Sequence, residues 1–138
     1  MIILSVDYGD KRTGIAACDK GEILATGIKT ITEWNSEALA QKIADEAQAR
    51  HAELIVIGLP RNMDGSCGYR TDECRKLGTL IETKSSISVD YWDERLTTVS
   101  AHAILNEVNV RGKARKDAVD ALSAEIILQN YIDFRRKK

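Results

Sequence analysis

The segment IILSVDYGDKRTGIAACDKGEILATGIKTI, residues 2–31, determines the predicted fold class of this chain. It contains three apolar runs joined by short connections with glycine and lysine, and each run is a predicted strand: 2–9, 13–19 and 21–31. Connections as short as these suit antiparallel hairpins. The first three strands are therefore predicted to form an antiparallel meander.

The rest of the chain alternates helices with strands. Residues 36–51 have the apolar spacing of an amphipathic helix that Ser36 would cap, and residues 52–60 are a continuous apolar run typical of a strand covered on both faces. Further elements are predicted as a helix over 69–84, a strand over 86–94 and helices over 97–108 and 117–134. Because strands reached through helices run parallel to their neighbours, we expect an α/β fold. The predicted fold contains a mixed five-stranded sheet, in which the last two strands run parallel to strand one, and helices cover both faces of the sheet.

Length and composition predict a single domain over residues 1–138 of a globular protein with 43% hydrophobic residues. The apolar runs are too short to span a bilayer and the N-terminus lacks the features of a secretion signal, so we expect a cytoplasmic protein with no membrane partner. The net charge of −1 does not by itself indicate a nucleic-acid-binding protein. Three cysteines without a CxxC pair favour reduced thiols over a zinc site.

Three acidic residues stand at comparable places in the predicted fold. Asp7 ends strand one, Glu94 ends strand five, and Asp120 lies one turn into the predicted last helix. Small residues follow it and would let that helix approach the sheet closely: Ala121, Ser123 and Ala124. Ligand sites collect at strand ends in open α/β sheets, and a carboxylate beside buried surface needs a partner. Converging carboxylates predict a hard divalent metal ion, Mg²⁺ or Mn²⁺.

Each of these acids also has a purely structural interpretation. Asp7 would cap a turn, and Glu94 would pair with Arg95 at the surface. Asp117 and Asp120 would be the N-cap and the third-residue acid that a helix dipole favours. The spacing alone leaves both interpretations open.

Four blocks of the sequence carry a resemblance to a known family. They are VDYGDKRTGIA (6–16), IVIGLPRNMDGS (55–66), DERLTTVSA (93–101) and VDALSAEIILQNYI (119–132). In this order, over nearly the whole chain, they resemble the YqgF/RuvX family, the pre-16S ribosomal RNA nucleases and Holliday-junction resolvases of bacteria with a ribonuclease H-like fold. The first block alone is weak because D-x-G loops also open the phosphate sites of actin-like ATPases and sugar kinases.

The resemblance implies metal-dependent hydrolysis of phosphodiester bonds. The family's acidic site falls on Asp7, Glu94 and Asp120, which would hold one or two Mg²⁺ or Mn²⁺ ions, with Asp117 as a further candidate ligand. In a two-metal site one ion activates the attacking water and the other stabilises the leaving oxygen. The substrate is expected to be pre-16S ribosomal RNA, at its 5′ end, or alternatively branched DNA. A monomer and a homodimer both remain open, and a symmetric junction resolvase would have to be a dimer.

Candidate substrate-binding residues lie in three segments of the chain: Lys11, Arg12, Asn62, Asp64, Arg111, Lys113, Arg115 and Lys116. The last four belong to VRGKARK (110–116), which contains no acid and is predicted to be a flexible basic clamp on phosphate. Solvation of the cations and turn formation by Asn62 and Asp64 are the alternatives.

Two interpretations belong to other functional classes. An ATP-binding domain of the actin and sugar-kinase type normally needs two related domains, and 138 residues leave room for one. A non-catalytic nucleic-acid-binding module is disfavoured by the presence of all three acids. Cleavage that requires Mg²⁺ would indicate the nuclease, whereas nucleotide binding would indicate the ATPase.

Overall fold

The structure is a computed structural model that describes residues 1–9, 12–60, 69–96 and 113–136. For Tyr69, Arg95 and residues 113–120 it describes the backbone only. The elements are β1 (Ile3–Tyr8), β2 (Arg12–Cys18), β3 (Ala25–Thr32), α1 (Ser36–Ala49), β4 (Leu54–Leu59), α2 (Tyr69–Ser85), β5 (Ser88–Asp93), the 3-10 turn η1 (Glu94–Leu96) and α4 (Lys113–Arg136). Within the described ranges, none of the helices has the length and apolar character needed to cross a membrane.

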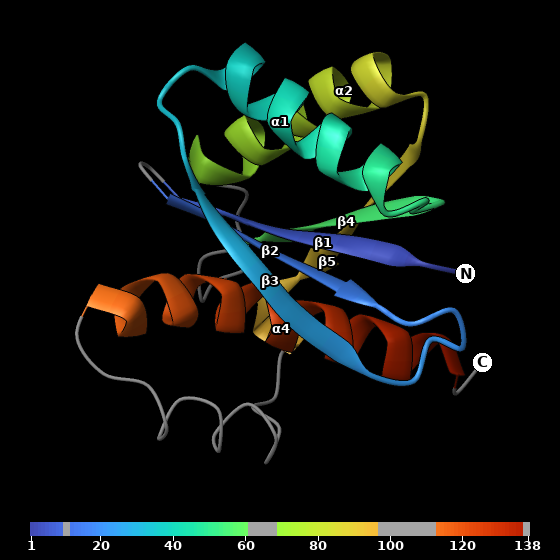
Figure 1. Cartoon of the computed structure of the whole chain (residues 1–138). Coiled ribbons are helices and arrows are strands. Elements are labelled where there is room, and N and C mark those ends of the chain that lie inside the picture. Colours follow the sequence, from blue (N-terminus) through green and yellow to red (C-terminus); the bar gives the residue numbers. More distant parts are fainter. Residues whose placement is uncertain (10–11, 61–68, 97–112, 137–138) are drawn as a thin grey trace.

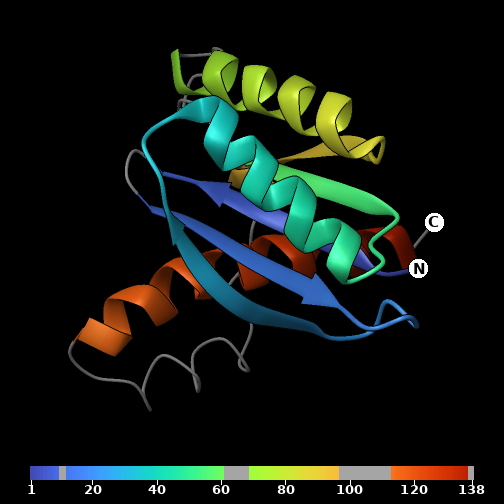
Figure 2. The same cartoon turned by 45° about the horizontal axis from the view of Figure 1, so that its top comes forward.

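The five strands form one mixed sheet in the order β3-β2-β1-β4-β5. β2 pairs antiparallel with both β1 and β3, whereas β4 pairs parallel with β1 and β5. Among the described elements, helices α1 and α2 lie together on one face of the sheet and α4 lies on the other (Figure 1). Figure 2 shows α1 and α2 side by side above the sheet. The predicted meander, the two parallel strands and the helices on both faces are confirmed.

Alternate residues of β1 face the two sides of the sheet. Leu4 and Val6 are buried in the core that contains residues of α1 and α2. Ile3 is buried in the second core with residues of α4, and Ser5 contacts the same helix. Because side chains alternate along a strand, Asp7 faces α4 as well.

Helix α4 packs very closely on the sheet. The fully buried Ser5 hydroxyl donates a hydrogen bond of 2.7 Å to the carbonyl oxygen of Ala124. A Cβ atom on Gly27 would lie only 3.0 Å from the carbonyl oxygen of Ala121, so glycine permits this approach. The close contact expected from the small residues of this helix is confirmed.

Side chains of α4 also bind the edge of β3. Gln129 accepts a hydrogen bond from the amide of Ala25 at 2.9 Å, and the buried Glu125 accepts one from the amide of Gly27 at 3.0 Å. These contacts satisfy amides on an edge strand that would otherwise be open to another chain. They also hold α4 along the strand.

Two of the predicted boundaries that differ from the structure have a visible physical cause. β3 begins at Ala25 instead of residue 21, because the Asp19 carboxylate accepts the amides of Ile23 and Leu24 and holds a turn there. The N-cap of α1 is Asn35, whose side chain accepts the amide of Ala38 at 3.0 Å, so the prediction of Ser36 was wrong. The predicted helix over 97–108 lies outside the described residues.

The start of α4 is the largest correction. The helix begins at Lys113, so Asp120 lies two turns into it instead of one. Asp117 is inside the helix, which excludes its role as the N-cap. The expected flexibility of VRGKARK is wrong for its last four residues, because Lys, Arg and Ala are good helix formers and continue α4. Its contact with phosphate stays a prediction.

The Ser5 hydroxyl should stabilise the contact between α4 and the sheet. Ser5→Ala removes a buried hydrogen bond and should lower the free energy of unfolding by about 1 kcal/mol. Urea denaturation at neutral pH measures this. Thr83→Ala is the matched control, because the Thr83 hydroxyl donates to the carbonyl of Thr79 on the exposed side of α2. This variant should lower the free energy of unfolding by less than about 0.5 kcal/mol. Equal losses would contradict the assignment.

Candidate active site

Asp7 lies at the carboxyl end of β1, half-buried and facing α4. Its partner in β2 is Gly14. On the other side Val6 pairs with Ile57 of β4, so the next residue along that strand is Gly58. Neither of these neighbouring positions in β2 and β4 has a side chain.

Glu94 is the first residue after β5, and its side chain lies over β4. A Cβ atom on Gly58 would come within 3.3 Å of the Cγ and Cδ atoms of Glu94 and within 2.6 Å of Ile127 Cδ1. Glycine at position 58 therefore makes the space that Glu94 occupies. Glycine inside an apolar strand is a sequence signal for such a close approach.

The carboxyl groups of Asp7 and Glu94 interact electrostatically. Burial, and to a smaller extent the neighbouring Asp7 carboxylate, together raise the pKa of Glu94 to about 7. Arg70 acts on the Glu94 pKa in the opposite direction. The structure thus brings together two of the three acids that the sequence placed at the site.

The third acid, Asp120, is placed through its helix. Glu22 accepts from both the N-terminal amino group and Arg135, so the end of α4 lies beside the start of β1 and the two run antiparallel. Ser5 of β1 contacts Ala124 of α4. Asp7 lies two residues after Ser5 along the strand, a distance of about 6.6 Å. Residue 120 lies four residues before Ala124 along the helix, a distance of about 6.0 Å in the same direction. The backbone of residue 120 is therefore level with Asp7.

The described residues contain no group of three or more His, Cys, Asp or Glu side chains arranged to hold a metal ion. The side chains of Asp117 and Asp120 are not among them. Asp7 and Glu94 are therefore the described part of the candidate acidic site.

Arg70 is a residue at this site that the sequence did not reveal. It lies in the first turn of α2 and donates from Nη2 to the carbonyl oxygen of Tyr8 at 2.6 Å. Its guanidinium group lies 4.8 Å from the centre of the Tyr8 ring and forms an ion pair with Glu73. A basic residue at a helix N-terminus opposes the helix dipole, and this was the available signal that it has a tertiary partner.

The candidate substrate-binding residues are only partly described. Arg12 is the exposed first residue of β2; it lies two residues before Gly14 and so faces α4 at the same edge as Asp7. The backbones of Lys113, Arg115 and Lys116 form the start of α4. The remaining candidates lie outside the described residues: Lys11, Asn62, Asp64 and Arg111.

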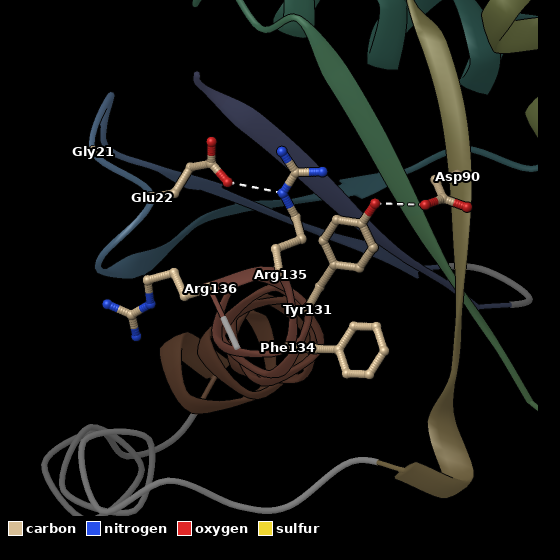
Figure 3. A pocket seen from close by; sticks show the side chains of 7 residues that line it. All are labelled: Gly21, Glu22, Asp90, Tyr131, Phe134, Arg135 and Arg136. Atoms are coloured by element: carbon tan, nitrogen blue, oxygen red, sulfur yellow. Dashed lines mark hydrogen bonds and ion pairs between the residues drawn. The ribbon is translucent and has the colours of Figure 1, made fainter. Parts of the chain in front are cut away.

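A hollow of about 510 Å³ lies at the C-terminal end of α4, away from residue 120 (Figure 3). Its charged groups are paired with their neighbours: Arg135 donates to Glu22 at 2.8 Å, and the Tyr131 hydroxyl donates to Asp90 at 2.5 Å. Neither of the two predicted acids whose side chains are described, Asp7 and Glu94, lines it. This hollow is therefore separate from the candidate active site.

The sequence matches the RuvX family, described as Holliday junction resolvase, over residues 1–134. The chain belongs to the RuvX family. A relative from Heliobacterium modesticaldum, named "Putative pre-16S rRNA nuclease", is 44% identical over 133 residues, 96% of this chain and 89% of the relative. A protein of Halothermothrix orenii with the same name is 37% identical over 137 residues, 99% of this chain and 98% of the relative.

Solved structures show the same fold. RuvC of Thermus thermophilus in complex with a Holliday junction substrate superimposes with a TM-score of 0.68 at 10% identity, covering 99% of this chain and 96% of RuvC. A fowlpox virus resolvase bound to Holliday junction DNA gives a TM-score of 0.55 at 14% identity, covering 98% of this chain and 99% of the resolvase. The RuvX chain therefore has the ribonuclease H-like fold of RuvC, as the sequence predicted.

Glu94 should make the stability of the metal-free protein depend on pH. Its pKa rises from the ordinary 4.5 to about 7 on folding, so the folded state holds the proton more tightly than the unfolded chain. The resulting stabilisation is complete below the unfolded value and is lost as the pH rises through about 7. Unfolding in denaturant with chelator, from about pH 5 to about pH 8, should show this loss in the parent and not in Glu94→Gln. Identical pH profiles would contradict it.

Proposed function

We propose that this RuvX chain is a metal-dependent nuclease that hydrolyses phosphodiester bonds. The observation that carries the proposal is the meeting of Asp7 and Glu94 at one strand edge, with the backbone of residue 120 level with Asp7. Asp7, Glu94 and Asp120 are the proposed catalytic acids. Family membership supports this interpretation over an ATP-binding domain or a non-catalytic binding module.

The residues fit a hard divalent cation. Asp7 and Glu94 provide carboxylate oxygens, which Mg²⁺ and Mn²⁺ prefer, and the raised pKa of Glu94 reflects burial and repulsion that a cation would offset. Asp7, Glu94 and Asp120 would hold one or two such ions, with Asp117 as a further candidate. When bound, the metal would supply an activated water and stabilise charge on the phosphate oxygens.

The chain's own cations would bring a polyanion to this acidic edge. Arg12 is exposed at the same edge on the α4 side, and we assign it a contact to phosphate. The first turn of α4 contains Lys113, Arg115 and Lys116, with Arg111 shortly before it. Lys11, Asn62 and Asp64 complete the proposed substrate-binding set.

We propose pre-16S ribosomal RNA as the substrate, processed at its 5′ end in the cytoplasm during ribosome biogenesis. The names of the relatives at 37% and 44% identity support this choice. Branched DNA is the second candidate, because the family description names Holliday junction resolvase. A resolvase of symmetric junctions would act as a homodimer, whereas RNA processing is compatible with a monomer.

Cleavage by the purified protein tests both the reaction and the substrate. Precursor ribosomal RNA, a four-way DNA junction and plain single strands are offered with Mg²⁺, with Mn²⁺ and with excess chelator. We expect precursor RNA to be cut only when the metal is present. Activity that persists in chelator would overturn the metal mechanism, and cleavage of the junction alone would select the second substrate.

The three acids should be needed for turnover and dispensable for folding. Asp7→Asn, Glu94→Gln and Asp120→Asn should each abolish most of the cleavage, because a neutral amide cannot balance the charge of a divalent ion. Without metal their melting temperatures should stay equal or rise, since one repelling charge is removed. The stabilisation that Mg²⁺ adds should shrink.

Asp45→Asn is the matched control for these acid variants. Asp45 is an exposed residue of α1, on the opposite face of the sheet, where it accepts a hydrogen bond from Gln41. It should keep the parent's rate and Mg²⁺ response. Asp117→Asn tests the fourth candidate ligand, because its place inside α4 removes any capping role. A principal variant with the parent's rate and Mg²⁺ response would remove that acid from the site.

The basic residues before and at the start of α4 should contribute to substrate affinity. Replacing Arg111, Lys113, Arg115 and Lys116 together with glutamine should weaken binding of nucleic acid and flatten its dependence on salt, because fewer counterions are released. Fluorescence anisotropy at several salt concentrations measures both. Mn²⁺ binding should be unchanged, and an unchanged salt slope would show that these residues do not contact phosphate.

A further inference from the structure

We propose that Arg70 is a positioning residue, which holds the carboxyl end of β1, and with it Asp7, in the geometry that the reaction needs. This inference rests on the proposed nuclease function. Its basis is a set of three contacts made by one guanidinium group: the Tyr8 carbonyl oxygen at 2.6 Å, Glu73 at 3.0 Å and the face of the Tyr8 ring at 4.8 Å.

The end of β1 needs such a contact because its support from the sheet changes there. β1 pairs with β2 as far as Tyr8, but its parallel pairing with β4 ends at Val6. Asp7 and Tyr8 therefore extend beyond the last pair with β4. Arg70 reaches this extension from α2 and binds the residue that directly follows Asp7.

The start of α2 is itself tied to the neighbouring strand. The Thr71 hydroxyl is fully buried and donates to the carbonyl oxygen of Pro60, directly after β4, at 2.8 Å. Two consecutive residues of α2 thus bind the chain just beyond β4 and the end of β1. The first turn of α2 acts as a bridge that replaces strand pairing where the sheet ends.

The shape of the arginine side chain matters more than its charge in this arrangement. A guanidinium group donates in two fixed directions and lies flat on an aromatic ring, whereas a lysine ammonium group is a compact charge without this fork. A role through charge alone would survive replacement by lysine. A positioning role would not.

The experiment compares Arg70→Lys and Arg70→Ala with Arg75→Lys as the matched control. Arg75 is on the same helix, and its guanidinium group lies 5.1 Å from the centre of the Tyr91 ring. The kcat and KM for Mg²⁺-dependent cleavage are measured, and Mn²⁺ affinity is measured separately from the spin-resonance signal of free Mn²⁺. Both Arg70 variants should lower kcat by roughly tenfold to a hundredfold, as displacement of a reacting group by about 1 Å does.

In both variants KM for nucleic acid should remain near the parent value. Mn²⁺ affinity should fall in Arg70→Lys, which keeps the charge and changes only the geometry, whereas Arg70→Ala also removes a cation that opposes the metal. Arg75→Lys should match the parent in all three quantities. Tyr8→Leu removes the ring and keeps the carbonyl, so it should give a smaller loss of kcat in the same direction. It also serves as the second variant if Arg70→Ala does not fold.

The possible outcomes separate this inference from the proposed function. Parent kinetics in Arg70→Lys would overturn positioning in favour of a charge effect, and a raised KM at constant kcat would make Arg70 a substrate contact instead. A parent protein that binds Mn²⁺ without cleaving nucleic acid would refute the nuclease. Arg70 would then be judged by Mn²⁺ affinity alone, and unchanged affinity in Arg70→Lys would overturn its positioning role.

Discussion

The hydrogen bond from Ser5 to the carbonyl oxygen of Ala124 sets the register on which the candidate site depends. A fully buried hydroxyl must find an acceptor, and for Ser5 this acceptor is the Ala124 carbonyl oxygen. The approach also needs Gly27 and Gly58, where a side chain would collide with α4. This contact, together with the direction given by the contacts of Glu22, places the backbone of α4 along the sheet.

The acidic edge carries a conflict of charges that its surroundings only partly resolve. Burial and the proximity of Asp7 both disfavour the ionised form of Glu94. Arg70 compensates in part, but its guanidinium group is also bound to Tyr8 and Glu73. A bound divalent cation would relieve the remaining repulsion. The same arrangement that weakens the metal-free protein would therefore supply free energy for binding the proposed cation.

The topology and two members of the site were predictable from the sequence because they follow from local patterns. Short connections required antiparallel strands, and the acids at the ends of strands one and five were expected to converge. Arg70 was not predicted because its partner, Tyr8, is 62 residues away in the chain. The start of α4 was missed because clustered cations before Asp117 are compatible with a solvated loop as well as with a helix. Asn35 and Ser36 are adjacent residues with similar capping preference.

The two halves of α4 have different tasks in this arrangement. From Ala121 to Arg135 the helix is held by contacts with β1, the edge of β3 and the turn before it. The preceding eight residues, 113–120, continue the same helix. Because a helix is stiff over two turns, the packed half determines where this backbone runs. Positions 120, 117 and 113 follow Ala124 on one helical face, in the order acid, acid and base away from the packed half. The packed half of α4 therefore positions the backbone that carries both the proposed acid at 120 and the basic residues before it.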